Sequence, residues 1–354
     1  MLSLRGDRAH FDAARPTNDP DFFSKIRQKS LDRVGGGNIN NKVRIEPPHQ
    51  AARVAVGALF TLTLAAVPVY PQDLTPRAYV ITPAGSHAVI LSYAFSKGAV
   101  LVDPTVPIED LTGTLQVPAL GYYHSFSFLG RSSNVTLIAP YLRGNFEATV
   151  DDVFTQVYRS GLADARVRFA VNLYGGRAMN PREYVKWNEK RLVGVSLTVA
   201  IPTGQYDPAR VINAGTNRWG FKPEMGFTRR WNRWVADWYI GGWFFTPNNK
   251  YFPGQSRRTQ APILSGEGHF GYYVTPRLWA SFDANFWAGS RTTVNGVEKQ
   301  DLQRNSRIGA TVSFPITRHQ ALTFSYSEGA YIAIGGDYRT FAAAWQYSWI
   351  TSPR

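Results

Sequence analysis

The sequence predicts an all-β protein, a transmembrane up-and-down antiparallel β-barrel of about 12 strands. Three observations lead to this prediction. Apolar residues recur at every second position in many segments, short polar turns alternate with long loops, and helical periodicity is nowhere sustained. No apolar run reaches the ~18 residues that a membrane-spanning helix needs, so a helical membrane protein is excluded.

Residues 192–204 show the alternation most clearly. The odd-numbered positions from Val193 to Ile201 are apolar, and the positions between them are Gly194, Ser196, Thr198 and Ala200. A strand here has one apolar face and one small, mildly polar face. A soluble sandwich would bury the apolar face, whereas a membrane barrel would turn it to lipid.

Twelve segments show such a pattern and are long enough to cross a bilayer, which takes about 9–11 residues. We expect strands near 86–99, 114–129, 134–145, 163–175, 191–203, 217–229, 234–246, 262–275, 278–290, 303–316, 320–333 and 338–350. Pro118, Pro140 and Pro315 fall inside these segments, where each removes one donor from the hydrogen-bond ladder.

The connections favour the membrane barrel. Short polar turns are predicted at 131–134, 229–233, 275–278 and 317–320, and long loops at 203–218, 246–262 and 289–301. Short turns at one end and long loops at the other are typical of outer-membrane barrels. We therefore expect the Val193–Ile201 face to contact lipid. The aromatic residues beside turns or at the chain end should lie at the water–lipid boundary, unless they are ordinary core residues; they are Trp231, Trp234, Trp279, Tyr347 and Trp349.

The chain divides into three predicted parts. Residues 1–53 read as a disordered leader or a misassigned start. Residues 54–72 contain an uncharged apolar block, 54–66, and the cleavage region of a signal peptide. Residues 73–354 form the barrel. The absence of cysteine excludes disulfides and suits an oxidising compartment.

The net charge of +14 raises the question of a nucleic-acid partner. Residues 73–354 contain no dense basic run, however, so the charges read as loop and strand-end residues and no nucleic acid is expected.

Four stretches resemble a known family: "TPRAYVITPAG", "GSHAVILSYAF", "ADARVRFAVNLYG" and "VAIPTGQYDPARVINAGTNRWGFKPEMGFT". The sequence is similar to the transporter family named for the MetA pathway of phenol degradation, over most of residues 75–350. The most specific part is the block Pro202–Pro208, followed by Asn213, Gly215, Asn217 and Trp219. The resemblance implies a Gram-negative outer-membrane location and passage of small hydrophobic or aromatic compounds.

The implied partners are outer-membrane lipid and lipopolysaccharide, the small solute and the outer-membrane assembly machinery. No cofactor or metal is implied. The last strand departs from the usual aromatic ending of such barrels, because Ile350 follows Trp349.

Polar and charged residues at predicted interior positions are the candidate lumen lining. They are Arg166, Arg168, Asn172, Glu224, Glu267, Asp283, Asn285 and Arg307. They could line a permeation path, or they could form a paired network that fills a narrow lumen. In the loop 203–218, a second set could form an outer mouth or only a stable turn: Tyr206, Asp207, Arg210 and Asn213.

Other functions are weighed against a channel. The run "YYHSFSF" contains His124, Ser125 and Ser127, but it lacks the Asn and Gly that follow in the H-x-S-N-G run of outer-membrane phospholipases. No G-x-S-x-G, H-E-x-x-H or P-loop motif is present, so no enzyme is expected. A structural barrel without transport and a secreted soluble β-sandwich remain as alternatives.

Overall fold

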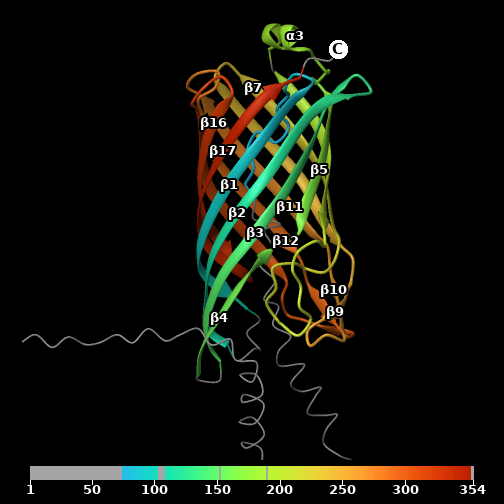
Figure 1. The fold of residues 1–354 in the computed structure, drawn as a ribbon, viewed down its shortest axis with the longest axis vertical. Coiled ribbons are helices and arrows are strands. Elements are labelled where there is room, and N and C mark those ends of the chain that lie inside the picture. The colour runs from blue at the N-terminus through green and yellow to red at the C-terminus, as the bar shows by residue number, and fades with distance from the viewer. Residues whose placement is uncertain (1–73, 103–107, 151–152, 189, 352–354) are drawn as a thin grey trace, which may run out of the picture. The chain divides into compact units, whose positions relative to one another are not determined.

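A computed structural model describes residues 74–102, 108–150, 153–188 and 190–351. Within these residues, antiparallel strands close into a barrel (Figure 1). The predicted leader 1–53 and the predicted signal region 54–72 lie outside the described residues.

Thirteen strands of the described residues form the barrel wall. They are β1 (Ser86–Leu101), β2 (Ile108–Phe128), β3 (Arg131–Val150), β4 (Val153–Leu162), β5 (Ala165–Tyr174), β6 (Arg191–Ile201), β7 (Gly220–Trp231), β8 (Trp234–Phe245), β11 (Ile263–Tyr273), β12 (Trp279–Gly289), β15 (Gln303–Pro315), β16 (Gln320–Ile332) and β17 (Gly335–Ile350). β1 pairs with β17, and the β2–β3 ladder completes the ring. β4 and β5 pair with successive parts of β3, so they share one of 12 positions. The predicted barrel of about 12 strands is confirmed.

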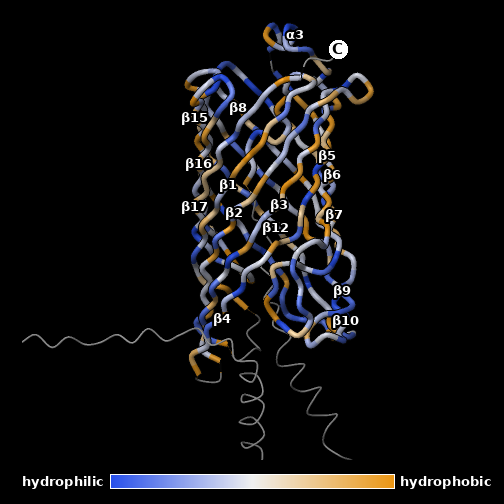
Figure 2. Tube along the Cα trace, in the orientation of Figure 1, coloured by the Kyte–Doolittle hydropathy of each residue, from blue (hydrophilic) through white to orange (hydrophobic). Residues whose placement is uncertain are grey.

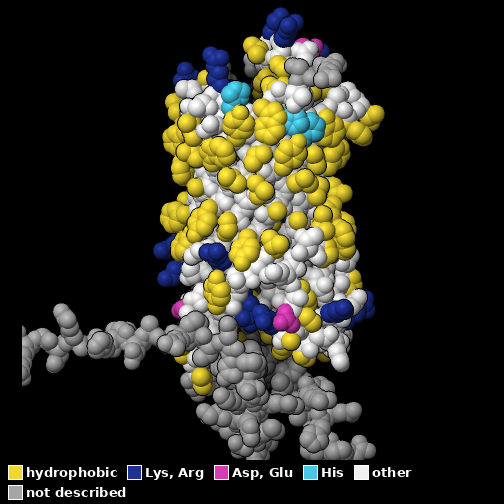
Figure 3. Space-filling view, in the orientation of Figure 1, with side chains coloured by type: hydrophobic (Ala, Val, Ile, Leu, Met, Phe, Trp, Pro, Cys, Tyr) yellow, Lys and Arg dark blue, Asp and Glu magenta, His cyan; other side chains and the backbone are white. Residues whose placement is uncertain are grey.

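The apolar faces point outward, as predicted. Along β12, Phe282 is 56% exposed and Phe286 is 54% exposed, whereas the alternate residues Asp283 and Trp287 are fully buried. β6 follows the same rule, with Gly194, Ser196 and Ala200 buried on the inner side. Hydropathy alternates along the strands in Figure 2, and hydrophobic side chains cover the wall between more polar ends in Figure 3. In a closed wall every strand has two hydrogen-bonded neighbours, so the backbone polar groups are paired. The apolar exterior can then contact hydrocarbon.

The two ends of the barrel differ. Short connections join β7 to β8, β11 to β12 and β15 to β16 at one end, as predicted. This end also carries α3 (Pro181–Lys186) (Figure 1). The helix begins with a capping box between Asn180 and Glu183. Among the described residues, no helix combines the length and the apolar character needed to cross a membrane.

Long loops gather at the other end. Two of them pair through β9 (Asn248–Tyr251), β10 (Ser256–Gln260), β13 (Thr292–Val294) and β14 (Val297–Glu298) into a small sheet. Long loops of such barrels lie outside the cell and short turns lie in the periplasm, so we assign the small sheet to the extracellular end.

The predicted turn at 131–134 is wrong. Residues Ser132 to Asn134 are buried within β3, and the turn is formed by Leu129 and Gly130, whose φ angles are 50° and 75°. Two positive φ values make the tight turn that suits a twisted hairpin. The exposed apolar Leu129 hid this turn, because it directly follows the apolar Phe128 at the end of β2.

β2 and β3 are longer than predicted, and β4 was not predicted as a separate strand. The pairing of β2 with β3 is interrupted between the pairs Gln116–Arg143 and Ala119–Pro140. Pro118 lies within this gap and Pro140 at its edge, and neither proline can donate a backbone hydrogen bond. The two prolines therefore loosen one ladder of the wall without breaking the ring.

A charge on the lipid face should destabilise the barrel. We expect Phe282→Arg to lower the free energy of unfolding in lipid vesicles by about 2–4 kcal/mol, because the guanidinium would enter hydrocarbon. Phe282→Leu is the matched control and should cost less. Urea unfolding followed by heat-modifiable gel migration measures both variants, and equal stability of the two would contradict the outward assignment.

Candidate functional site

The segment before β1 runs through the barrel interior (Figure 1). Tyr79 and Ile81 are almost completely buried there. The Tyr79 hydroxyl lies 3.0 Å from Ser196 Oγ and donates to Glu224 Oε1 at 3.0 Å. The wall makes room for the ring with a glycine, because a Cβ on Gly226 would lie 2.2 Å from Tyr79. Residues 74–85 therefore fill part of the lumen.

An ion pair also attaches this segment to the wall. Arg77 Nη1 lies 3.5 Å from Asp237 Oδ1, and the Arg77 backbone N–H donates to Asp237 Oδ2 at 3.3 Å. The Thr228 hydroxyl donates to the same carboxylate. Next along the chain, Ala78 N–H donates to the Tyr239 hydroxyl at 3.0 Å. A buried carboxylate requires such partners, so Asp237 ties the segment to β8.

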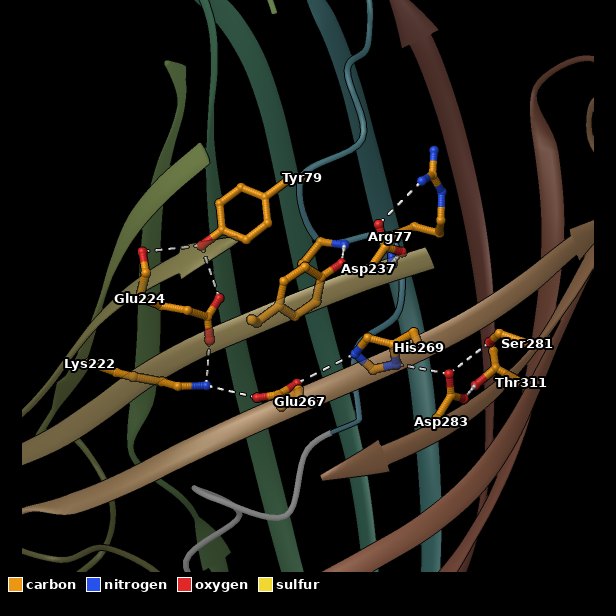
Figure 4. A network of polar contacts seen from close by, with 12 residues as sticks. Arg77, Tyr79, Lys222, Glu224, Asp237, Glu267, His269, Ser281, Asp283 and Thr311 are labelled. Carbon is orange, nitrogen blue, oxygen red and sulfur yellow. Dashed lines mark hydrogen bonds and ion pairs between the residues drawn. The ribbon is translucent and has the colours of Figure 1, made fainter. Parts of the chain in front are cut away.

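Ionisable side chains of β7, β11 and β12 form a continuous chain across the lumen wall (Figure 4). Lys222 Nζ lies 2.6 Å from Glu224 Oε2 and 3.0 Å from Glu267 Oε1. His269 Nε2 lies 3.7 Å from Glu267 Oε2, and His269 Nδ1 lies 2.8 Å from Asp283 Oδ1. Acidic and basic groups alternate along this path, so each buried ionisable side chain has a partner.

Asp283 ends the chain and is fully buried. Besides His269, it accepts hydrogen bonds from the Ser281 hydroxyl at 2.8 Å and the Thr311 hydroxyl at 2.7 Å. These contacts link β11, β12 and β15 on the inner face of the wall.

The structure brings several of the predicted lumen residues together. Arg168 Nη2 lies 3.7 Å from Glu224 Oε1, and its guanidinium lies 4.7 Å from the centre of the Tyr79 ring. Asn172 and Asn285 are also buried, and Arg307 donates to the Ser327 hydroxyl at 3.1 Å. The contacts of Glu224, Glu267 and Asp283 favour the paired network over free pore-lining charges.

Sequence reasoning missed Arg77, Tyr79, Lys222, Asp237 and His269. For Lys222 and His269 the signal was present, because they alternate with outward residues just as Glu224 and Glu267 do. For Arg77 and Tyr79 no signal existed, since they precede the first strand and show no period of their own.

A cavity of about 410 Å³ remains between the segment 75–82 and the wall. Its lining includes apolar residues such as Ala88, Ile90 and Ile138 and charged residues such as Arg168 and Lys222. Arg166 also borders the cavity. This volume is within the range of small-molecule sites, which are mostly apolar with a few polar groups.

Apolar side chains continue from the cavity region toward the long-loop end. Leu115, Leu142, Phe146 and Tyr338 form one buried cluster on the β2, β3 and β17 side. A second cluster on the opposite side contains Ala200, Trp243, Ile263 and Trp287. The interior toward the long-loop end therefore contains both of these apolar clusters, together with buried polar residues such as Gln303 and Asn305.

The residues proposed for an outer mouth form a compact turn. Asp207 Oδ2 lies 2.9 Å from Arg210 Nε. Asn213 Oδ1 accepts from Asp207 N–H at 2.8 Å, and Asn213 Nδ2 donates to the backbone oxygens of Asp207 and Arg210. Tyr206 donates to the Lys250 carbonyl at 3.0 Å, and burial raises the pKa of its hydroxyl. These contacts favour a stable turn.

The run at 122–128 does not assemble a Ser–His pair. Ser125 is buried in the interior and donates to the Pro83 carbonyl at 2.6 Å. The His124 ring stacks on His87, with 4.3 Å between centroids, and its Nδ1 lies 3.3 Å from the Ser86 carbonyl. Adjacent residues of a strand point to opposite faces, so His124 and Ser125 diverge. Among the described residues, no group of three His, Asp or Glu side chains could hold a metal ion.

Comparison with known families decides the assignment. Residues 98–330, more than half of the chain, match the model of the family described as "Putative MetA-pathway of phenol degradation". The chain belongs to this family. Among curated proteins, none matches the sequence.

Solved structures of outer-membrane barrels share the fold. A COG4313 outer membrane channel from Pseudomonas putida F1 has 16% sequence identity and a TM-score of 0.66, over 78% of this chain and 100% of that one. The transport unit of the autotransporter AIDA-I from Escherichia coli has 10% identity and a TM-score of 0.51, over 86% of this chain and 100% of that one. The predictions of the family and of the barrel fold are confirmed.

Removing a charge from the interior chain should destabilise the barrel strongly. We expect Asp283→Asn to lower the free energy of unfolding by about 3–5 kcal/mol, because it breaks a buried pair. Asp207→Asn is the control and should cost at most about 1 kcal/mol, since its ion pair is half exposed. Urea unfolding in vesicles, followed by tryptophan fluorescence, measures both. Similar losses in the two variants would contradict the role given to the interior chain.

Proposed function

We propose that the barrel passes small hydrophobic or aromatic compounds across the outer membrane. The observation that carries the proposal is the lumen cavity, whose lining includes the apolar residues Ala88, Ile90 and Ile138 and the ring of Trp243. Transfer of an apolar solute from water to such a surface is favourable. Membership of a phenol-degradation family supports the same class of solute.

The contents of the lumen support selective rather than open passage. Residues 74–85 occupy part of the interior through Arg77 and Tyr79, and the charged chain from Lys222 to Asp283 is internally paired. Paired charges offer little to a hydrated ion, because binding one would require breaking an existing pair. We therefore infer low permeability to ions and sugars.

The remaining assignments are proposals of the same kind. The protein acts without catalysis, in keeping with the divergence of His124 and Ser125. Lipopolysaccharide contacts the extracellular end, and the assembly machinery inserts the barrel. Residues 54–72 direct secretion, and the mature chain begins near Asp73. N-terminal sequencing of membrane-extracted protein tests the last point, and residues before about 60 would contradict it.

Transfer assays distinguish the channel from a structural barrel. Vesicles with a lipopolysaccharide outer leaflet, which slows passive diffusion, should take up toluene several-fold faster with the protein than without it, and glucose at the background rate. Toluene uptake equal to that of protein-free vesicles would rule out the channel.

An ester-cleavage assay tests the alternative of a hydrolase. We expect no cleavage by the unchanged chain or by Ser125→Ala, whereas a hydrolase would cleave the ester and lose that activity in the variant.

Removing the ring at position 79 should open the lumen. We expect Tyr79→Ala to raise single-channel ion conductance several-fold, because the ring fills space between β6 and β7. Tyr79→Phe keeps the ring and serves as the control, with conductance close to that of the unchanged chain. Planar-bilayer recording measures all three. Equal conductance of Tyr79→Ala and Tyr79→Phe would mean that residues 74–85 do not limit flow.

A further inference from the structure

The short-turn end of the barrel is strongly basic. Residues 128–131, 174–191, 229–234, 273–279 and 315–320 contain eleven Lys and Arg and two acidic residues, Glu183 and Glu189. The basic residues are Arg131, Arg177, Arg182, Lys186, Lys190, Arg191, Arg229, Arg230, Arg233, Arg277 and Arg318. At the long-loop end the balance is nearly even, with twelve basic and eleven acidic residues in 97–114, 143–160, 202–220, 245–262, 289–304 and 328–339. The charge excess of the barrel therefore lies on the periplasmic side.

Two of these arginines face each other on the membrane side of the wall. Arg191 of β6 and Arg229 of β7 are directly paired in the ladder, and both are exposed. They alternate in step with Val193 and Phe227, so they point outward rather than into the lumen. Within the part of the chain that the structure describes, neither guanidinium has an ion-pair or hydrogen-bond partner. Like charges directly opposite in a sheet destabilise it unless an anion joins them.

A comparison within the same end shows that this arrangement is specific. Arg131 and Arg177 are also cross-strand neighbours, through an isolated bridge. Arg177 Nη2, however, lies 3.8 Å from Glu183 Oε1, so an acidic residue already partly balances that pair. The pair formed by Arg191 and Arg229 has no such balance among the described residues.

Aromatic residues fix the depth of the pair in the membrane. Trp231 lies two positions beyond Arg229, and Trp234 follows across the turn; each is 40% exposed. Both rings pack on Phe270, with centroid distances of 6.0 Å and 4.9 Å. Exposed tryptophans of barrels lie at the boundary between lipid and water. Arg229 is therefore at the level of lipid headgroups, where the available anion is a phosphate.

We propose that Arg191 and Arg229 bind the headgroup phosphate of an anionic phospholipid, of the phosphatidylglycerol class, in the periplasmic leaflet. Side chains directly opposite in antiparallel strands lie close enough for two guanidiniums to meet one phosphate. Each guanidinium matches phosphate geometry with two parallel donors. The short-turn side faces the periplasm, so lipopolysaccharide of the outer leaflet is not the ligand of this site.

Native mass spectrometry of the purified full-length chain tests the proposal. The protein is titrated with phosphatidylglycerol and, separately, with phosphatidylcholine of the same acyl chains. We expect phosphatidylglycerol to bind at least five-fold more tightly, and the difference to shrink as ionic strength rises. Equal affinity for the two lipids would overturn the proposal without any variant.

Variants locate the site. Arg191→Gln with Arg229→Gln should lower the affinity for phosphatidylglycerol at least five-fold and leave phosphatidylcholine binding unchanged. Lys250→Gln with Arg257→Gln removes the same charge from exposed positions at the long-loop end and should change neither affinity. Heat-modifiable migration checks folding, and Arg191→Lys with Arg229→Lys keeps the charge if the glutamine variant does not fold.

Three results would overturn the assignment to this pair. One is an equal loss in the long-loop control, which would indicate a diffuse charge effect. The second is undiminished phosphatidylglycerol binding in the glutamine variant. The third is displacement of the lipid by inorganic phosphate at equal concentration, which would indicate a site for a free ion.

Discussion

The requirement to turn apolar side chains toward hydrocarbon while satisfying every backbone hydrogen bond shapes the whole barrel. Closing the sheet through the β1–β17 and β2–β3 ladders removes both edges. Because the side-chain period of a strand is two, outward Phe282 and Phe286 leave Asp283 and Trp287 on the inner side. The polar interior is thus a consequence of the apolar exterior, and its charges must then find partners.

The N-terminal segment helps to meet that second demand. Arg77 reaches Asp237, and the Tyr79 hydroxyl reaches Glu224, so the segment supplies a cation and a donor to carboxylates that the wall alone would leave less satisfied. The same contacts place its backbone across the lumen. The same segment therefore both fills the lumen and pairs with charged groups of the wall. The cavity beside residues 75–82 is the space that the segment does not fill.

Periodicity and turn chemistry were enough to predict the barrel, because both are local. Each strand repeats the same alternation, and turns such as 275–278 break it with proline. Local patterns do not determine features that depend on distant contacts. Leu129 is an apolar residue within a turn, and the division between β4 and β5 depends on contacts with β3 and with the loop after β6.

Local sequence patterns also do not predict which interior charged residues contact one another. His269 and Asp283 are separated by 14 residues, and Arg77 and Asp237 by 160 residues, although each pair is in direct contact. Alternation can state that a residue faces inward, as it did for Glu224 and Glu267. It cannot state which charge meets which, because that depends on ladder register and on the path of a segment outside the sheet.

The most specific stretch of the sequence, Pro202–Pro208, is explained by anchoring the extracellular loop. Asp164, buried between β4 and β5, accepts from Gly204 N–H at 2.9 Å and from the Thr216 hydroxyl at 2.6 Å. A Cβ on Gly204 would lie 2.6 Å from the Gly215 Cα, so the two loop ends can approach only as glycines. Tyr206 then ties the loop to Asn248 of the small sheet. The motif thus holds the loop in place at the mouth, and the choice of solute is to be sought deeper, in the cavity lined by Ile90, Ile138, Arg168 and Lys222.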